Sequence, residues 1–149
     1  MTWDVIFCAT ADGSVPGADF LDGCPAKVRG TILAVLDTVA AAPPPAFSGG
    51  GKWEAMHGDM GGYYEIRVTG PGREQFRLFC MLENADKRTL TARGLRGPAI
   101  AVITGMRKKT GTVFSDRDYV KVRRLGNDYT AQEPAASQAN DRFLTDTTS

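Results

Sequence analysis

The chain has 149 residues, of which 42% are hydrophobic and 23% are charged, with a formal net charge of +1. This is the size of one globular domain, and it is long enough to bury a core without disulfides or structural metals. No apolar run approaches the ~18 residues of a membrane span, residues 1–4 lack a secretion signal, and the three cysteines form no CxxC pair, so we expect a cytoplasmic protein with reduced thiols.

The first predicted elements are a strand and two helices. Residues 3–8 are rich in aromatic and β-branched side chains, which is typical of a strand. Residues 18–22 can form a short helical turn, and Pro25 suits the first position of a longer helix. That helix must end before the prolines at 43–45, and residues 43–51 form a loop within the domain. The apolar side chains of the helix that begins at Pro25 recur at helical spacing: Val28, Ile32, Val35, Leu36 and Val39.

The middle of the chain predicts an antiparallel meander. Residues 53–56 can form a short strand, and residues 63–69 alternate between apolar and polar side chains. A hairpin connection at residues 70–72 leads to the partner strand at residues 75–82. Short connections of this kind favour antiparallel pairing.

The last third of the chain predicts a further strand and a closing helix. Leu90 is expected on a short strand extension, and residues 99–106 form an apolar strand. Ser115 or Asp116 can cap a helix from about residue 117 to residue 125.

Together these elements predict an α+β fold. The N-terminal strand and helices pack on a central antiparallel sheet, and a C-terminal helix closes the domain. We expect the domain to span residues 1–126 and to be followed by a polar, flexible tail at residues 127–149.

Positive charge is concentrated in the C-terminal half. Residues 93–125 hold nine basic residues against two acidic ones, a local balance of +7. Such a block indicates either a surface for a polyanion or a solvated helix face.

Two familiar kinds of site do not fit the sequence. Residues 48–52 resemble a phosphate-binding loop, but Ala46 and Trp53 stand where that motif needs Gly and Ser or Thr. One histidine and three scattered cysteines cannot form a zinc site of the usual kind, so we expect no metal. His57 lies in a polar segment and is either a surface residue or a group for proton transfer near neutral pH.

Three basic elements can converge on one face of the predicted sheet. Arg67 points away from the apolar side of its strand, and Arg77 lies across the hairpin on the next strand. Residues 107–109, which are Arg-Lys-Lys, follow the last strand. Because neighbouring strands lie about 4.8 Å apart, these side chains can surround one phosphate. The alternative is a charged outer face that keeps the sheet soluble.

These residues also carry a resemblance to a known family. Residues 64–67 (Tyr-Glu-Ile-Arg), Arg77 in an apolar strand, and residues 105–110 (Gly-Met-Arg-Lys-Lys-Thr) before a basic helix resemble the RelE/HigB toxin superfamily. The branch that they resemble is the phage-derived HigB-like group of type II toxin–antitoxin toxins. The resemblance covers roughly residues 3–129. Thr104 stands where many members have a histidine, so no histidine mechanism is expected at that position.

The resemblance implies a toxin that cleaves mRNA on the ribosome. A ribose 2′-OH attacks the adjacent phosphate, which requires a base, cations for the developing charge and an acid for the leaving oxygen. The implied catalytic residues hold the phosphate or stabilise charge, and one lysine can act as the base: Arg67, Arg77, Lys108 and Lys109. The implied substrate-binding residues serve stacking, charge or proton transfer: Tyr63, Arg107, Tyr119 and His57.

The same resemblance sets the expected partners. It implies no cofactor, a helix-turn-helix antitoxin that covers the basic face, contacts with mRNA and the ribosome, and no membrane. Two alternatives stay open. A ParE-like toxin would share the fold and poison DNA gyrase, and a degenerate member would serve only as a partner-binding module.

Overall fold

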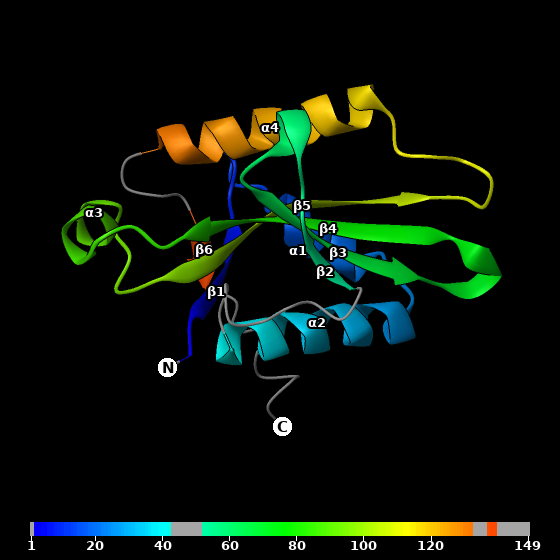
Figure 1. Ribbon diagram of the computed structural model, residues 1–149, viewed down its shortest axis with the longest axis horizontal. Helices are drawn as coiled ribbons and strands as arrows, with labels where there is room; N and C mark the ends of the chain where they lie inside the picture. Colours follow the sequence, from blue (N-terminus) through cyan, green and yellow to red (C-terminus); the bar gives the residue numbers. More distant parts are fainter. Residues whose placement is uncertain (1, 43–51, 133–136, 140–149) are drawn as a thin grey trace.

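The protein is built on one mixed β-sheet with helices on both faces (Figure 1). The structure is a computed structural model that describes residues 2–42, 52–132 and 137–139. The sheet has six strands in the order β2-β3-β4-β5-β1-β6. The strands are β1 (Asp4–Cys8), β2 (Trp53–Ala55), β3 (Tyr63–Thr69), β4 (Gln75–Glu83), β5 (Ala99–Lys108) and β6 (Ser137–Ala139). The helices are α1 (Pro16–Asp22), α2 (Ala26–Ala41), α3 (Lys87–Ala92) and α4 (Asp116–Ala131), with 3₁₀ turns η1 (Gly58–Met60) and η2 (Pro71–Arg73).

The predicted α+β class is confirmed. The central strands β2 to β5 form the antiparallel meander, and α4 is the closing C-terminal helix. β1 lies next to β5 and runs parallel to it, although α1, α2, the strands β2 to β4 and α3 separate the two in the sequence.

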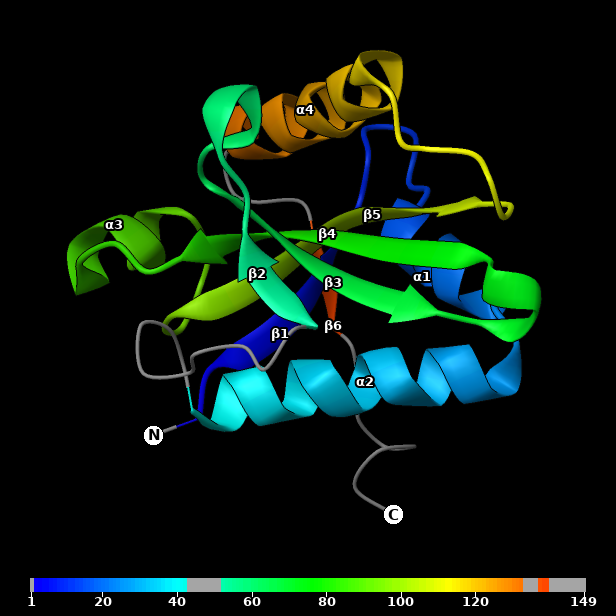
Figure 2. The same cartoon turned by 45° about the vertical axis from the view of Figure 1, so that its right-hand side comes forward.

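α2 covers one face of the sheet with the stripe that its sequence predicts (Figure 2). Its side chains at Val28, Ile32, Leu36 and Val39 are buried in one cluster with apolar side chains of the sheet such as Ile66. Most of this face is therefore filled by apolar packing.

α4 covers the opposite face and begins with a capping box. The Ser115 hydroxyl accepts a hydrogen bond from the Asp118 amide at 3.3 Å, and the Asp118 carboxylate accepts one from the Ser115 amide at 2.9 Å. Val122 and Tyr129 of the helix are buried against the sheet. A Cβ added at Gly126 would lie 1.9 Å from the Tyr63 hydroxyl oxygen, so only glycine allows this close approach.

Several elements differ from the expectations. Leu90 lies in α3 rather than on a strand, because Asp86 caps that helix by accepting a hydrogen bond from the Thr89 amide at 2.9 Å. α4 continues to Ala131, past the expected end near residue 125, and β6 pairs with β1 within the segment expected to be a tail. The expected loop at residues 43–51 lies outside the described residues.

The register of β4 and β5 decides which side chains share a face. Phe79 pairs with Thr104 and Cys80 with Val102, so one extra residue of β5 forms a bulge between them. Beyond the bulge, Arg77 pairs with Met106. Because directly paired residues point to the same side of a sheet, the far end of β5 presents alternate side chains to α4 and to α1.

Candidate functional site

Three of the predicted cations lie on the same face of the sheet, the one that α4 covers. Arg67 and Arg77 pair directly across β3 and β4. Lys108 pairs with Gln75, one pair further along the same face. The two arginines are therefore immediate neighbours, and the lysine lies diagonally from Arg77.

Each of these three cations forms an ion pair with a carboxylate. The pairs are Arg67–Glu54 at 3.2 Å, Arg77–Glu65 at 3.1 Å and Lys108–Asp118 at 3.2 Å. The site is thus largely neutral in this structure. An anion that binds here must compete with carboxylates that already contact the same nitrogen atoms.

The pair between Arg77 and Glu65 is the most enclosed of the three, with side chains 17% and 14% exposed. Burial raises the pKa of the Glu65 carboxyl, and the positive charges of Arg77 and Arg67 offset part of this rise. Burial likewise lowers the pKa of the Arg77 guanidinium, which also lies 5.1 Å over the Phe114 ring. Glu65 is therefore a stronger base than an exposed carboxylate.

Arg107 lies on the opposite face from Arg77 and Lys108, which corrects its expected place in the cluster. Its guanidinium donates to Glu74 at 2.9 Å and to the Gly23 carbonyl at 2.9 Å, and it lies 4.7 Å over the Phe76 ring. β5 continues through this position, and consecutive strand residues point to opposite faces. Arg107 therefore ties the sheet to α1 and its following turn.

Lys109 and Tyr63 also lie away from the cluster. Lys109 is exposed just after β5; the hydrogen bond from Arg107 is the main cause that lowers the pKa of Glu74, and the charge of Lys109 adds a smaller effect. Tyr63 is buried between the sheet and α4, and burial raises the pKa of its phenol. The structure thus uses Tyr63 in the core rather than as a surface for stacking.

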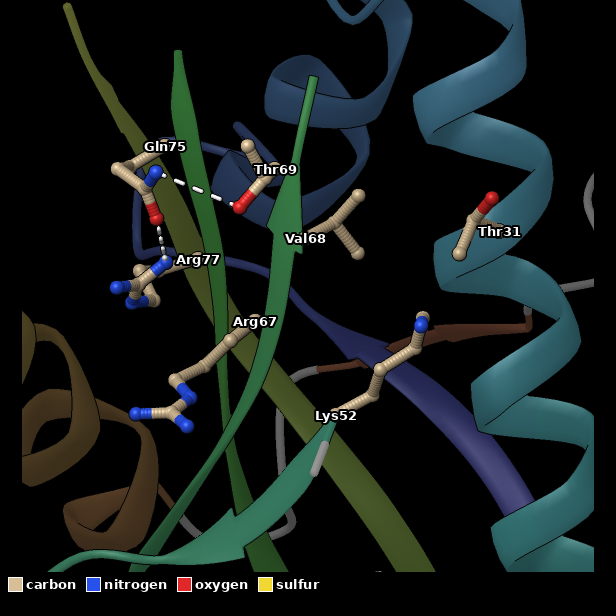
Figure 3. A pocket seen from close by; sticks show the side chains of 7 residues that line it. All are labelled: Thr31, Lys52, Arg67, Val68, Thr69, Gln75 and Arg77. Carbon is tan, nitrogen blue, oxygen red and sulfur yellow. Dashed lines mark hydrogen bonds between the residues drawn. The ribbon is translucent and has the colours of Figure 1, made fainter. Parts of the chain in front are cut away.

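A cavity of about 680 Å³ lies along β3 where this strand extends past the short β2 (Figure 3). Lys52, Arg67 and Arg77 contribute cations to its lining, and none of the described residues that line it is a carboxylate. Figure 3 shows Lys52 on the α2 side of β3 and the two arginines on the other side. This cation-lined cavity suits an anion that reaches the arginines where β3 extends past β2.

A second cavity, of about 500 Å³, lies between the β2–η1 segment and the first turns of α4. It is lined by His57 and Tyr119, the two remaining predicted residues, and by Arg123. Four carboxylates also line it: Glu54, Asp59, Glu65 and Asp116. The structure therefore brings His57 and Tyr119 together with acidic groups and not with the lysines.

Sequence reasoning missed the carboxylates of this site. Glu65 lies two residues before Arg67 on the same strand, so strict alternation already places both side chains on one face. Asp118 lies three residues after Ser115, which is the spacing of a capping box. Glu54 carries no comparable signal, because its position depends on how β2 pairs with β3.

No protein-family model matches this sequence, and a search of curated proteins finds no match. Among the described residues, no group of three or more His, Cys, Asp or Glu side chains is placed to hold a metal ion. None of the helices in the described ranges is long and apolar enough to cross a membrane.

Proposed function

We propose that this chain is the toxin of a type II toxin–antitoxin pair and acts as an endoribonuclease on mRNA without a metal. One observation carries the proposal: Arg67 and Arg77 pair directly across two strands, with Lys108 on the same face beside them. Phosphate recognition favours two guanidinium groups in this arrangement, because each presents a fork of donors to the oxygens.

In the proposed reaction, Arg67 and Arg77 bind two oxygens of the scissile phosphate. The phosphate displaces Glu54 from Arg67. This ion pair is more exposed than the pair Arg77–Glu65, since the side chains of Glu54 and Arg67 are 48% and 42% exposed. As the 2′-oxygen attacks, negative charge develops on the phosphorus oxygens, and the two guanidiniums and the Lys108 ammonium stabilise it.

Glu65 is the best placed base for this reaction. Its carboxylate contacts Arg77 and lines the second cavity together with Tyr119. It takes the proton of the 2′-OH, a 2′,3′-cyclic phosphate forms, and the bond to the 5′-oxygen breaks. Tyr119 or His57 donates a proton to that leaving oxygen, so the products are a cyclic phosphate end and a 5′-hydroxyl end.

The proposal is tested by alanine substitution on the two faces of the sheet. Arg67→Ala and Lys108→Ala lower mRNA cleavage by translating ribosomes by about 10²–10³-fold and relieve growth arrest, since each removes one charge-stabilising group. Arg107→Ala is the matched control, because the same charge is lost at the same end of the sheet but on the opposite face. Folded Arg67→Ala protein with undiminished cleavage contradicts the proposal.

The proposal includes a cytoplasmic location and a helix-turn-helix antitoxin that covers the arginine face. The ion pairing of all three cations also favours a second candidate, a partner-binding module without nuclease activity. Intact mRNA together with retained binding to an antitoxin supports that module. Breakage of DNA after induction instead supports a gyrase-directed toxin.

A further inference from the structure

The two cavities share a wall that separates opposite charges. In the pairs Arg67–Glu54 and Arg77–Glu65, the arginine lines the first cavity and the glutamate lines the second. A phosphate is therefore attracted to the first cavity and repelled from the second. A ligand that spans this wall must carry its anionic group on the first side and a neutral or cationic group on the second.

The second cavity has surfaces that suit a flat, neutral ring. Met56, Met60 and the Tyr119 ring contribute apolar area to its lining. The Tyr119 ring is held edge-on against Phe79, with ring centroids 6.1 Å apart, and Arg123 is held by a contact of 3.4 Å with the Met60 sulfur. Its volume of about 500 Å³ falls within the range of small-molecule sites.

We propose that this second cavity binds the nucleobase next to the scissile phosphate and prefers guanine. The inference rests on the proposed function and adds the identity of the base that this site selects. RNA bases that are splayed out of a strand are typically stacked on aromatic rings and bonded through their Watson–Crick edges. Tyr119 offers the ring, and the groups around it offer the edge contacts.

The choice of guanine follows from the donors and acceptors of the lining. Ionised carboxylates only accept hydrogen bonds, and arginine only donates them. Guanine presents two adjacent donors, N1–H and the N2 amino group, beside the acceptor O6. Adenine and cytosine present an amino group next to an acceptor nitrogen, and uracil presents one N–H between two acceptors. Carboxylates with Arg123 beside them therefore match guanine best.

Asp59 and Asp116 are the carboxylates that determine this specificity. Glu54 and Glu65 contact arginines, whereas Asp59 and Asp116 form no ion pair within the described ranges. Asp59 comes from η1 and Asp116 from the first turn of α4, so they approach the cavity from its two walls.

Binding of 3′-mononucleotides tests the inference independently of cleavage. The full chain is titrated with 3′-GMP and 3′-AMP by NMR, and 3′-GMP is expected to bind about tenfold more tightly. Asp59→Asn and Asp116→Asn, singly and combined, replace an acceptor by a group that also donates, and they abolish this preference. Asp37→Asn on the exposed side of α2 makes the same change of charge elsewhere and retains the preference.

Three results overturn the inference: equal binding of the two nucleotides, a guanine preference that survives the double variant, or shifts at Tyr119 with spermine but with neither nucleotide. The last result would assign the cavity to a cationic ligand. The proposed function is tested separately, by measuring the cleavage of mRNA on translating ribosomes. Guanine-selective binding without mRNA cleavage contradicts the proposed nuclease activity and supports the guanine site. Cleavage without selective binding supports the nuclease activity and contradicts the guanine site.

Discussion

The partly buried contact between Glu65 and Arg77 makes the chemistry of the site sensitive to pH. Because burial raises the pKa of Glu65, its carboxyl stays protonated up to a higher pH than an exposed glutamate. A protonated carboxyl cannot accept the 2′-OH proton. Single-turnover cleavage by the wild type should therefore rise with pH through the raised pKa of Glu65 and then level off.

Glu65→Gln removes the base and keeps the shape of the side chain. We expect the cleavage rate of this variant to fall by about 10²–10⁴-fold, the usual contribution of a general base. The rise of the rate with pH that the wild type shows at low pH should also disappear. Asp37→Asn serves as the control for a lost carboxylate. If Glu65→Gln keeps the pH profile of the wild type at a lower rate, another group is the base.

Residue by residue, the sequence predicts part of the site through strand alternation. Arg67 and Arg77 share a face because each lies on a strand whose apolar neighbours point the other way. Arg107 lies on the opposite face from Lys108 because β5 continues past residue 106 to Lys108, so strand alternation separates the two side chains. Alternation also places Glu65 on this face and the capping-box spacing places Asp118 at the start of α4, but the position of Glu54 depends on the pairing of β2 with β3, which no local pattern shows.

Among the elements, α4 covers the face of the sheet that carries the site, and its first turn is capped by Ser115. Ser115→Ala removes the hydroxyl that caps the helix, so the free energy of unfolding should fall by about 1 kcal/mol. Urea denaturation followed by circular dichroism measures this change. Thr112→Ala, three residues earlier in the exposed loop before α4, should leave the stability within about 0.5 kcal/mol of the wild type. An equal loss in both variants contradicts a specific role for the cap.

The contact of α4 with the sheet is tested at Gly126. Gly126→Ala places a methyl group 1.9 Å from the Tyr63 hydroxyl oxygen, so the helix or the ring must move. Overpacking of this kind costs about 1–3 kcal/mol, more than alanine gains over glycine within a helix. Tyr63→Phe removes the clashing oxygen, so the double variant should recover part of the loss in a denaturation experiment. Strictly additive effects of the two substitutions would show that the contact is not direct.

The elements themselves were predictable where one local signal dominates. The apolar stripe of α2 and the alternation of β3 are such signals, and both elements lie where they were expected. Leu90 lies in α3 rather than on the strand that its apolar surroundings favour, because the cap at Asp86 begins a helix there. The parallel pairing of β1 with β5 joins segments far apart in sequence, so only the packing of the whole chain decides it.

At the scale of the whole molecule, two apolar cores lie on opposite faces of one sheet. Cys80 belongs to the core under α2, and Cys8 belongs to the core under α4. Both thiols are buried, and burial raises the pKa of each well above the usual value for cysteine. Because the same strands β1, β4 and β5 contribute side chains to both cores, neither core can open widely without disturbing the other.

Thiol labelling can therefore decide whether the molecule unfolds as one unit. In mild urea, Cys8 and Cys80 should react with a thiol reagent at the same rate, set by global unfolding, because an opening that exposes one core disrupts the shared sheet. Mass spectrometry of the labelled peptides gives the two rates separately. Ser115→Ala should raise both rates by the same factor, since it lowers the stability of the whole domain. Faster labelling of Cys8 alone would instead mean that α4 detaches as a separate unit and exposes the arginine face before the rest of the chain unfolds.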